Sequence, residues 1–203
     1  RYFEAGVKWL FGKNQLVGDA RTALLLLTTT IPTAIIGLVV LIFTEDLGDR
    51  IWLVALCLGI FGIALWVADK RSSYRRCEDL SFKEAFLIGT VQGLAFQPGV
   101  SRAGAALTIT RWLHLERVEA ARFVFLMSLP VIAGAGLLKV GDLTVPSGWW
   151  PPFLVGTVAA SVSGYLAVHW LLRFVSQGGF GIFMGYRLAI GISIFIILLT
   201  DWR

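Results

Sequence analysis

Gln97-Pro98-Gly99-Val100-Ser101-Arg102-Ala103-Gly104 interrupts a run of apolar sequence with a helix-breaking Pro-Gly pair and a charged side chain. Arginine at bilayer depth is costly and is usually kept for an anionic partner. Backbone that leaves the helix at that depth survives only where protein or a water-filled cavity surrounds it. This stretch therefore predicts a break between two half-length helices, with a functional site at the break.

The composition is that of a helical membrane protein. Of the 203 residues, 57% are hydrophobic and only 15% are charged, against about 25% charged in soluble domains. Five apolar stretches approach the roughly 20 residues that cross a bilayer. These expected spans are 22–44, 51–68, 118–138, 152–174 and 180–200. We predict an all-α polytopic membrane protein.

Basic residues gather in short segments beside these spans. The net charge is +5, but its placement argues against nucleic acid as a partner and favours contacts with anionic lipid. The basic run Lys70-Arg71 and Arg75-Arg76 follows the span 51–68, whereas the acidic pair Glu45-Asp46 precedes it. The positive-inside rule places the basic loop in the cytoplasm and the acidic loop outside.

A helical hairpin is expected over 82–113. Ser81-Phe82-Lys83-Glu84 has the pattern of a capping box that opens a helix. That helix has too few residues to span before the Pro-Gly break, and a second short helix follows over about 103–113. The alternative is one long tilted span, which would carry the Pro-Gly pair and the arginine near mid-bilayer.

The expected organisation is a single transmembrane domain over 1–203. A hairpin and three spans make up its second part, and inverted repeats of this kind are common around midplane sites. If the chain contains two inverted repeats, the first copy lacks its hairpin and most of one span. The parts are then 1–68, the remainder of the first repeat; 69–81, the cytoplasmic basic loop; 82–113, the re-entrant hairpin; and 114–203, the three spans of the second repeat.

The residues at the break suit a phosphate group. Arg102 offers a planar fork of donors that matches phosphate oxygens, and Ser101 adds a hydroxyl. Amides of a glycine-rich turn that opens a helix add further donors and the positive end of the helix dipole. The structural alternative is that Arg102 staples the hairpin by bonding backbone carbonyls. Gln92 and Gln97 are expected to cap the broken helix or to orient water.

The other polar residues of the spans are expected to be structural. Arg187 is expected to snorkel or to pair within the bundle, in preference to substrate contact, and His169 is interpreted as structural. The sequence shows no pair of intramembrane carboxylates for a metal and no nucleophile beside a base. It therefore predicts half of a hydrolytic site.

Three stretches resemble the undecaprenyl-diphosphate phosphatase family, the bacitracin-resistance membrane phosphatases. They are 89–104, with its PGxSR core; Glu119–Phe123 leading into Phe125–Pro130; and Tyr186-Arg187. The resemblance covers nearly the whole chain. It implies two inverted repeats, each a re-entrant hairpin plus three spans, in the bacterial inner membrane. It also implies removal of the terminal phosphate from the C55 isoprenyl diphosphate at a site open to the external face, which recycles the carrier lipid for cell-wall synthesis.

The same resemblance implies roles for individual residues. Arg102 and Ser101 would be the catalytic residues that hold the diphosphate, and the substrate-binding residues would be Gly99, Gly104, Gln97 and Gln92. The implied cofactor is a divalent cation, magnesium by preference. The implied partner is an isoprenyl diphosphate lipid, and a homodimer is retained as an alternative to a monomer.

Two departures from the family pattern separate the alternatives. Ala103 and Ala105-Ala106 stand where polar neighbours of the phosphate are common. The first family signature, a glutamate pair and a Ser-Ser-x-Gly-His element, is absent, so metal ligands are expected upstream of Arg1 and not in this chain. We expect an N-terminally truncated member that is inactive by itself. The other two hypotheses are a transporter or flippase of an anionic isoprenoid lipid and an inactive paralogue.

Overall fold

The computed structural model describes residues 18–43, 50–141, 144–146 and 148–200, and this part of the chain is helical with no β-sheet. The elements are α2 (Gly18–Phe43), α3 (Ile51–Asp69), η1 (Cys77–Asp79), α4 (Phe82–Gly93), η2 (Leu94–Phe96), α5 (Arg102–Trp112), α6 (Arg117–Val140), α7 (Trp150–Gln177) and α8 (Gly181–Leu199). The expected interfacial stretch 1–21 lies mostly outside the described residues, and the acidic pair Glu45-Asp46 lies outside them entirely.

Five helices are long and apolar enough to cross a membrane. They are Ala20–Val40, Ile51–Asp69, Arg117–Leu137, Trp150–Gln177 and Gly181–Leu199. The prediction of five spans and of an all-α membrane protein is confirmed, with ends that differ from the expected ones by a few residues. Many of their large hydrophobic side chains are exposed, as is usual for helices whose solvent is lipid.

The segment between the second and third spans forms a helical hairpin and not one continuous helix. The capping box is present: Ser81 Oγ accepts from the amide of Glu84, while the Glu84 carboxylate accepts from the amide of Ser81. Arg75 joins the two ends of the hairpin, because its guanidinium pairs with Glu84 at 2.7 Å and donates to the carbonyl of Leu113 at 3.2 Å. The start of α4 and the end of α5 therefore lie together.

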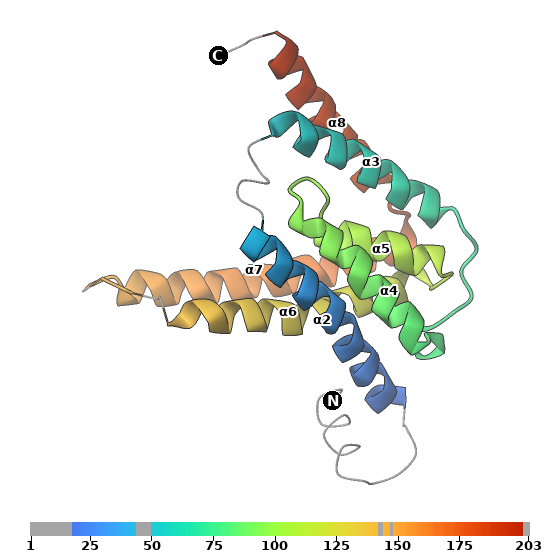
Figure 1. Cartoon of the computed structure of the whole chain (residues 1–203), viewed down its shortest axis with the longest axis horizontal. Coiled ribbons are helices and arrows are strands. Elements are labelled where there is room, and N and C mark those ends of the chain that lie inside the picture. Colours follow the sequence, from blue (N-terminus) through green and yellow to red (C-terminus); the bar gives the residue numbers. More distant parts are fainter. Residues whose placement is uncertain (1–17, 44–49, 142–143, 147, 201–203) are drawn as a thin grey trace.

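The longer helices enclose this hairpin (Figure 1). α2 packs along α4, while α3 and α6 pack on α5. The α2–α4 contact is close, since Thr33 Oγ1 donates to the carbonyl of Gly89 at 2.8 Å and a side chain at Gly89 would collide with the carbonyl of Thr29. α3 and α8 lie side by side, and α6 and α7 run alongside each other away from the hairpin.

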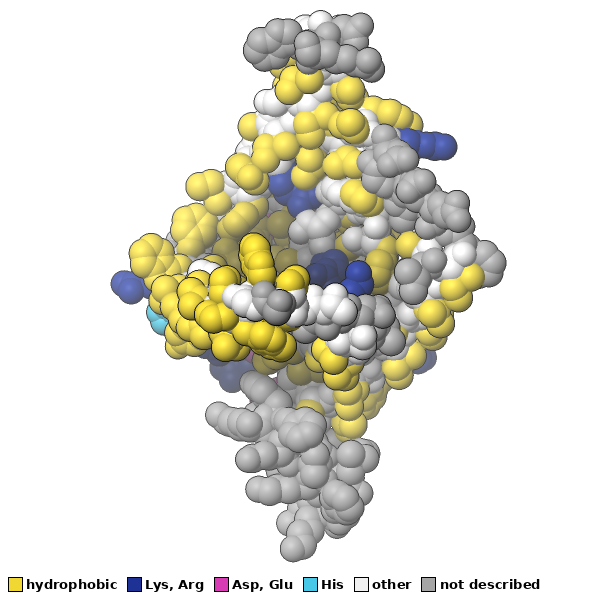
Figure 2. Space-filling model, turned by 90° about the vertical axis from the view of Figure 1, so that its left-hand side faces the viewer, with side chains coloured by type: hydrophobic (Ala, Val, Ile, Leu, Met, Phe, Trp, Pro, Cys, Tyr) yellow, Lys and Arg dark blue, Asp and Glu magenta, His cyan; other side chains and the backbone are white. Residues whose placement is uncertain are grey.

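The surface combines apolar faces with recessed charge. Figure 2 shows Lys and Arg side chains set back between hydrophobic side chains on one face of the molecule. No residue of the most apolar part of α7 is buried against the rest of the chain. The outer surface is therefore largely apolar, and some of the basic side chains are recessed within it.

Candidate functional site

The turn between α4 and α5 has an unusual backbone. Gly99 and Ser101 have positive φ angles of 93° and 67°, and Val100 between them is buried. A side chain at Gly99 would collide with the carbonyl of Val54 in α3. Glycine is therefore required there both for its conformation and for the close approach of α3.

Ser101 caps α5 and places its hydroxyl at the start of the helix. Its Oγ accepts a hydrogen bond from the amide of Gly104 at 3.3 Å, which is the usual N-cap arrangement. The hydroxyl hydrogen is left to donate elsewhere. Non-glycine residues seldom adopt positive φ, and such residues are concentrated at functional sites.

Arg102 is the first residue of α5 and its side chain is exposed. Within the described residues its guanidinium has no hydrogen bond and no ion pair. The alternative in which Arg102 staples the hairpin through backbone carbonyls is therefore not observed in this part of the chain. Its charge is available to a ligand at the helix N-terminus, where the free amides and the dipole also favour an anion.

Arg187 of α8 performs the stapling instead. Its Nη2 donates to the carbonyls of Gly99 and Val100 at 2.5 and 3.1 Å, and its Nε donates to the carbonyl of Leu58 at 3.3 Å. Its Nη1 lies 3.6 Å from the point that a Cβ on Gly104 would occupy. The expected pairing of Arg187 within the bundle is confirmed, and its partner is the turn itself.

The two glutamines lie in different surroundings. Gln97 Nε2 donates to the carbonyl of the next residue, Pro98, at 3.3 Å, which lies beyond the end of the helix. Gln92 is on α4 and only 2% exposed, and its Nε2 has no hydrogen-bond partner in the described part of the chain. A buried unpaired donor costs about 1–3 kcal/mol. Gln92 is the one predicted substrate-binding residue that lies within α4 and outside the turn.

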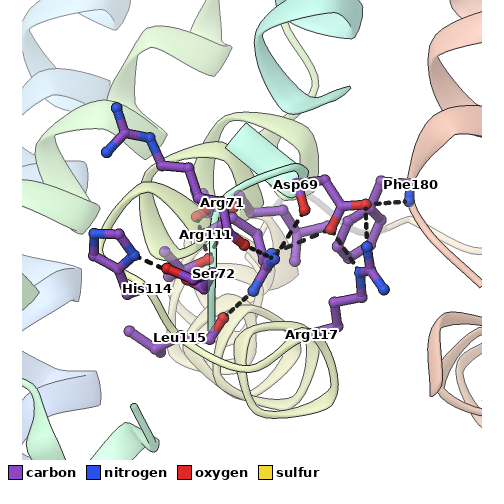
Figure 3. A network of polar contacts seen from close by, with 11 residues as sticks. Asp69, Arg71, Ser72, Arg111, His114, Leu115, Arg117 and Phe180 are labelled. Atoms are coloured by element: carbon purple, nitrogen blue, oxygen red, sulfur yellow. Dashed lines mark hydrogen bonds and ion pairs between the residues drawn. The ribbon is translucent and has the colours of Figure 1, made fainter. Parts of the chain in front are cut away.

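A second polar cluster, which the sequence interpretation missed, lies at the other end of α5 (Figure 3). Asp69, at the end of α3, accepts from Arg111 Nε at 3.2 Å, from Arg117 Nε and Nη2 at 2.8 and 3.0 Å, and from the amide of Phe180 at 3.0 Å. Arg111 is 1% exposed and also donates to the carbonyls of Asp69 and Arg71, both at 3.0 Å. One carboxylate thus connects α3, α5, α6 and the start of α8.

The described residues hold no group of three His, Cys, Asp or Glu side chains that could bind a metal ion. Asp69 is saturated by its four donors. His114 Nδ1 lies 2.8 Å from the carbonyl of Ser72, and the ring of His169 stacks on Tyr165. The donor set of this part of the chain therefore does not fit a divalent cation.

Comparison with known proteins identifies the family. The family model "Bacitracin resistance protein BacA" matches residues 2–193. An undecaprenyl-diphosphatase of Nocardioides sp. is 33% identical, with 90% of this chain and 68% of the relative covered. Those of Gemmatimonas aurantiaca and Mycolicibacterium gilvum are 38% and 35% identical, covering 88% and 98% of this chain and 67% and 75% of the relatives.

The match to the family model includes the hairpin, the turn with Ser101 and Arg102, and most of α8 with Arg187. The resemblance first noted in three short stretches therefore extends over almost the whole chain, which spans two thirds to three quarters of the length of these relatives. The chain belongs to the BacA family of bacitracin-resistance proteins, whose curated relatives are undecaprenyl-diphosphatases.

Proposed function

We propose that this chain binds the diphosphate of an isoprenyl lipid at the turn between α4 and α5, as part of the hydrolysis of undecaprenyl diphosphate to undecaprenyl phosphate and inorganic phosphate. The observation that carries the proposal is Arg102, an exposed and unpaired guanidinium at the N-terminus of α5. Membership of the BacA family supports the substrate and the reaction.

Each residue of the turn has a part in binding. The Arg102 guanidinium pairs with two phosphate oxygens and offsets their charge, which a planar fork does better than a single ammonium. The Ser101 hydroxyl, oriented by the bond that it accepts from Gly104, donates to a third oxygen. Arg187 fixes the carbonyls of Gly99 and Val100 away from the anion, so that only donors face it.

Gly104 and the glutamines complete the proposed binding site. A side chain at Gly104 would lie 3.3 Å from Ser101 Oγ, so glycine leaves the space beside the hydroxyl open. Gln97 holds the turn through Pro98, and the unpaired amide of Gln92 is a donor for a water or a ligand oxygen in α4. The divalent cation implied by the family resemblance remains a prediction.

The proposal extends to topology. The basic segment that contains Lys70, Arg71, Arg75 and Arg76 joins α3 to the base of the hairpin, and the positive-inside rule places it in the cytoplasm. The hairpin then enters from the cytoplasmic face of the bacterial inner membrane and its turn points toward the external face, where the site opens. We also propose that α4–α8 form one of two inverted repeats.

Binding of an isoprenyl diphosphate to the purified chain tests the proposal. In nanodiscs, we expect the chain to bind farnesyl diphosphate more tightly than farnesol. Arg102→Gln should weaken diphosphate binding by about tenfold to a hundredfold, since a charge-assisted hydrogen bond contributes about 1.5–3 kcal/mol. Arg122→Gln is the matched control, because Arg122 is also exposed and has only a loose contact of 3.6 Å with Glu119.

Equal binding by wild type and Arg102→Gln would contradict the proposed site. Phosphate release is measured in the same samples. The sequence leads us to expect no release by the 203-residue chain alone. Magnesium-dependent release by this chain would overturn that expectation and leave the binding site in place.

A further inference from the structure

Two cations at the end of α3 each rest on a tryptophan ring. Lys70 Nζ lies 3.3 Å from the centroid of the Trp66 ring, and the Arg71 guanidinium carbon lies 3.7 Å from that of Trp112. Trp66 is in the last turn of α3, whereas Trp112 is the last residue of α5. We call Trp66, Lys70, Arg71 and Trp112 the basic–aromatic rim.

The buried ion pair sets both tryptophans at one level of the molecule. Arg111 Nε bonds the Asp69 carboxylate and Arg111 Nη2 bonds the Asp69 carbonyl, which aligns the end of α5 with the end of α3. Trp112 follows Arg111 directly, and Lys70 follows Asp69 directly. Tryptophan favours the depth of the lipid headgroups, and both rings belong to the last turns of α3 and α5 that this ion pair joins.

The positive charge of the rim is not neutralised by any side chain in the described part of the chain. The nearby carboxylate of Asp69 is saturated by Arg111, Arg117 and an amide, and Glu84 is paired with Arg75. Within the described residues, the side chains of Lys70 and Arg71 form no hydrogen bond and no ion pair. Both are exposed, and the rings beneath them restrict where their charges lie.

We propose that the basic–aromatic rim binds the phosphate headgroup of an anionic phospholipid in the leaflet at the base of the hairpin. The two cations would contact the phosphodiester, while the exposed parts of the tryptophans would contact the glycerol and upper acyl region. This surface lies at the opposite end of α5 from Arg102, so it is separate from the proposed diphosphate site.

Lipid binding to the purified 203-residue chain, resolved by native mass spectrometry, tests the proposal. The probes are dioleoyl phosphatidylglycerol and dioleoyl phosphatidylcholine. We expect the wild type to prefer phosphatidylglycerol. Each cation removed should weaken that binding about fivefold, so Lys70→Gln/Arg71→Gln should lose about 25-fold, because a basic residue near an anionic membrane contributes about 1 kcal/mol. Phosphatidylcholine binding should be unchanged.

Lys139→Gln is the control, since Lys139 is exposed at the far end of α6. Lys70→Arg/Arg71→Lys keeps both charges and should bind within about twofold of wild type. The proposal is supported if the neutral double variant loses the preference for phosphatidylglycerol while Lys139→Gln and Lys70→Arg/Arg71→Lys keep it. Equal affinity of the wild type for both lipids, an unaltered double variant, or the same loss in Lys139→Gln would overturn it. If the neutral double variant does not fold, the two single variants and the wild-type lipid preference decide the outcome.

Discussion

The Asp69 cluster provides the sharpest test of how this fold is held together. Asp69 is 6% exposed and Arg111 is 1% exposed, so the pair is shielded from water. Asp69→Asn keeps the size of the side chain but removes the negative charge. Arg111 would then remain buried without a counterion, and the guanidinium cannot lose its proton to compensate.

The magnitude follows from this burial. Removing one partner of a buried ion pair costs about 3–5 kcal/mol, because the remaining charge is left uncompensated. Asparagine retains an oxygen that can accept from Arg117 or the Phe180 amide, so we expect the lower part of that range. For a chain of this size that corresponds to a fall in Tm on the order of 10 °C.

Tryptophan fluorescence during thermal unfolding in detergent measures the effect, and 8 tryptophans give the signal. Glu116→Gln is the matched control: Glu116 is exposed and its side chain does not cap α6. Arg117→Gln should have a smaller effect than Asp69→Asn, because the Arg117 side chain is 41% exposed and reaches water. A Tm of Asp69→Asn equal to that of Glu116→Gln would refute the reasoning that the buried charge pair holds the four elements together.

Three further predictions concern the hairpin. Arg187→Lys keeps the charge but has one nitrogen, which cannot bond both the Leu58 carbonyl and the turn carbonyls as Nε and Nη2 do, so the affinity for farnesyl diphosphate should fall at least tenfold; equal affinity would contradict the stapling role. Gly99→Ala should lower Tm and abolish binding of farnesyl diphosphate, because alanine is strained at a φ of 93° and its Cβ would collide with the Val54 carbonyl. Normal binding would show that α3 moves to make room for the methyl group. The Arg75 guanidinium, together with two hydrogen bonds from Ser81, lowers the pKa of Glu84 from 4.5 to about 2. These contacts contribute stability above pH 4.5 that is lost as the pH falls toward 2, at most about 3 kcal/mol in all, and Glu84→Gln should flatten this part of the pH–stability curve.

The sequence was sufficient for the hairpin because its signals are local. A Pro-Gly pair breaks the helix wherever it lies, and the Ser81–Glu84 capping box depends on residues only three apart. The availability of Arg102 was also predictable, since the sequence places it at the start of a helix with no acidic residue beside it.

The Asp69 cluster could not be predicted because its members are distant in sequence. Arg111 and Arg117 lie 42 and 48 residues from Asp69, and only the packing of α3 and α6 on α5 brings them together. A partial signal existed: Asp69 ends an apolar span and Arg111 lies inside a short apolar helix, and each needs a partner at such depth. The sequence did not show which of the many basic residues would pair with Asp69. Arg187 differs, since its expected role was correct but its acceptors are backbone carbonyls that no sequence pattern reveals.

The fastening of both hairpin ends by Arg75 has a consequence for how the protein is made. The guanidinium of Arg75 binds Glu84 at the start of α4 and the Leu113 carbonyl at the end of α5. In the topology proposed above, both ends lie on the cytoplasmic side, and no charged loop would have to cross the bilayer to build this element. Only a short turn rich in glycine, with one arginine, travels inward. In that topology, the hairpin would form as a local folding event between two segments whose ends Arg75 already holds together.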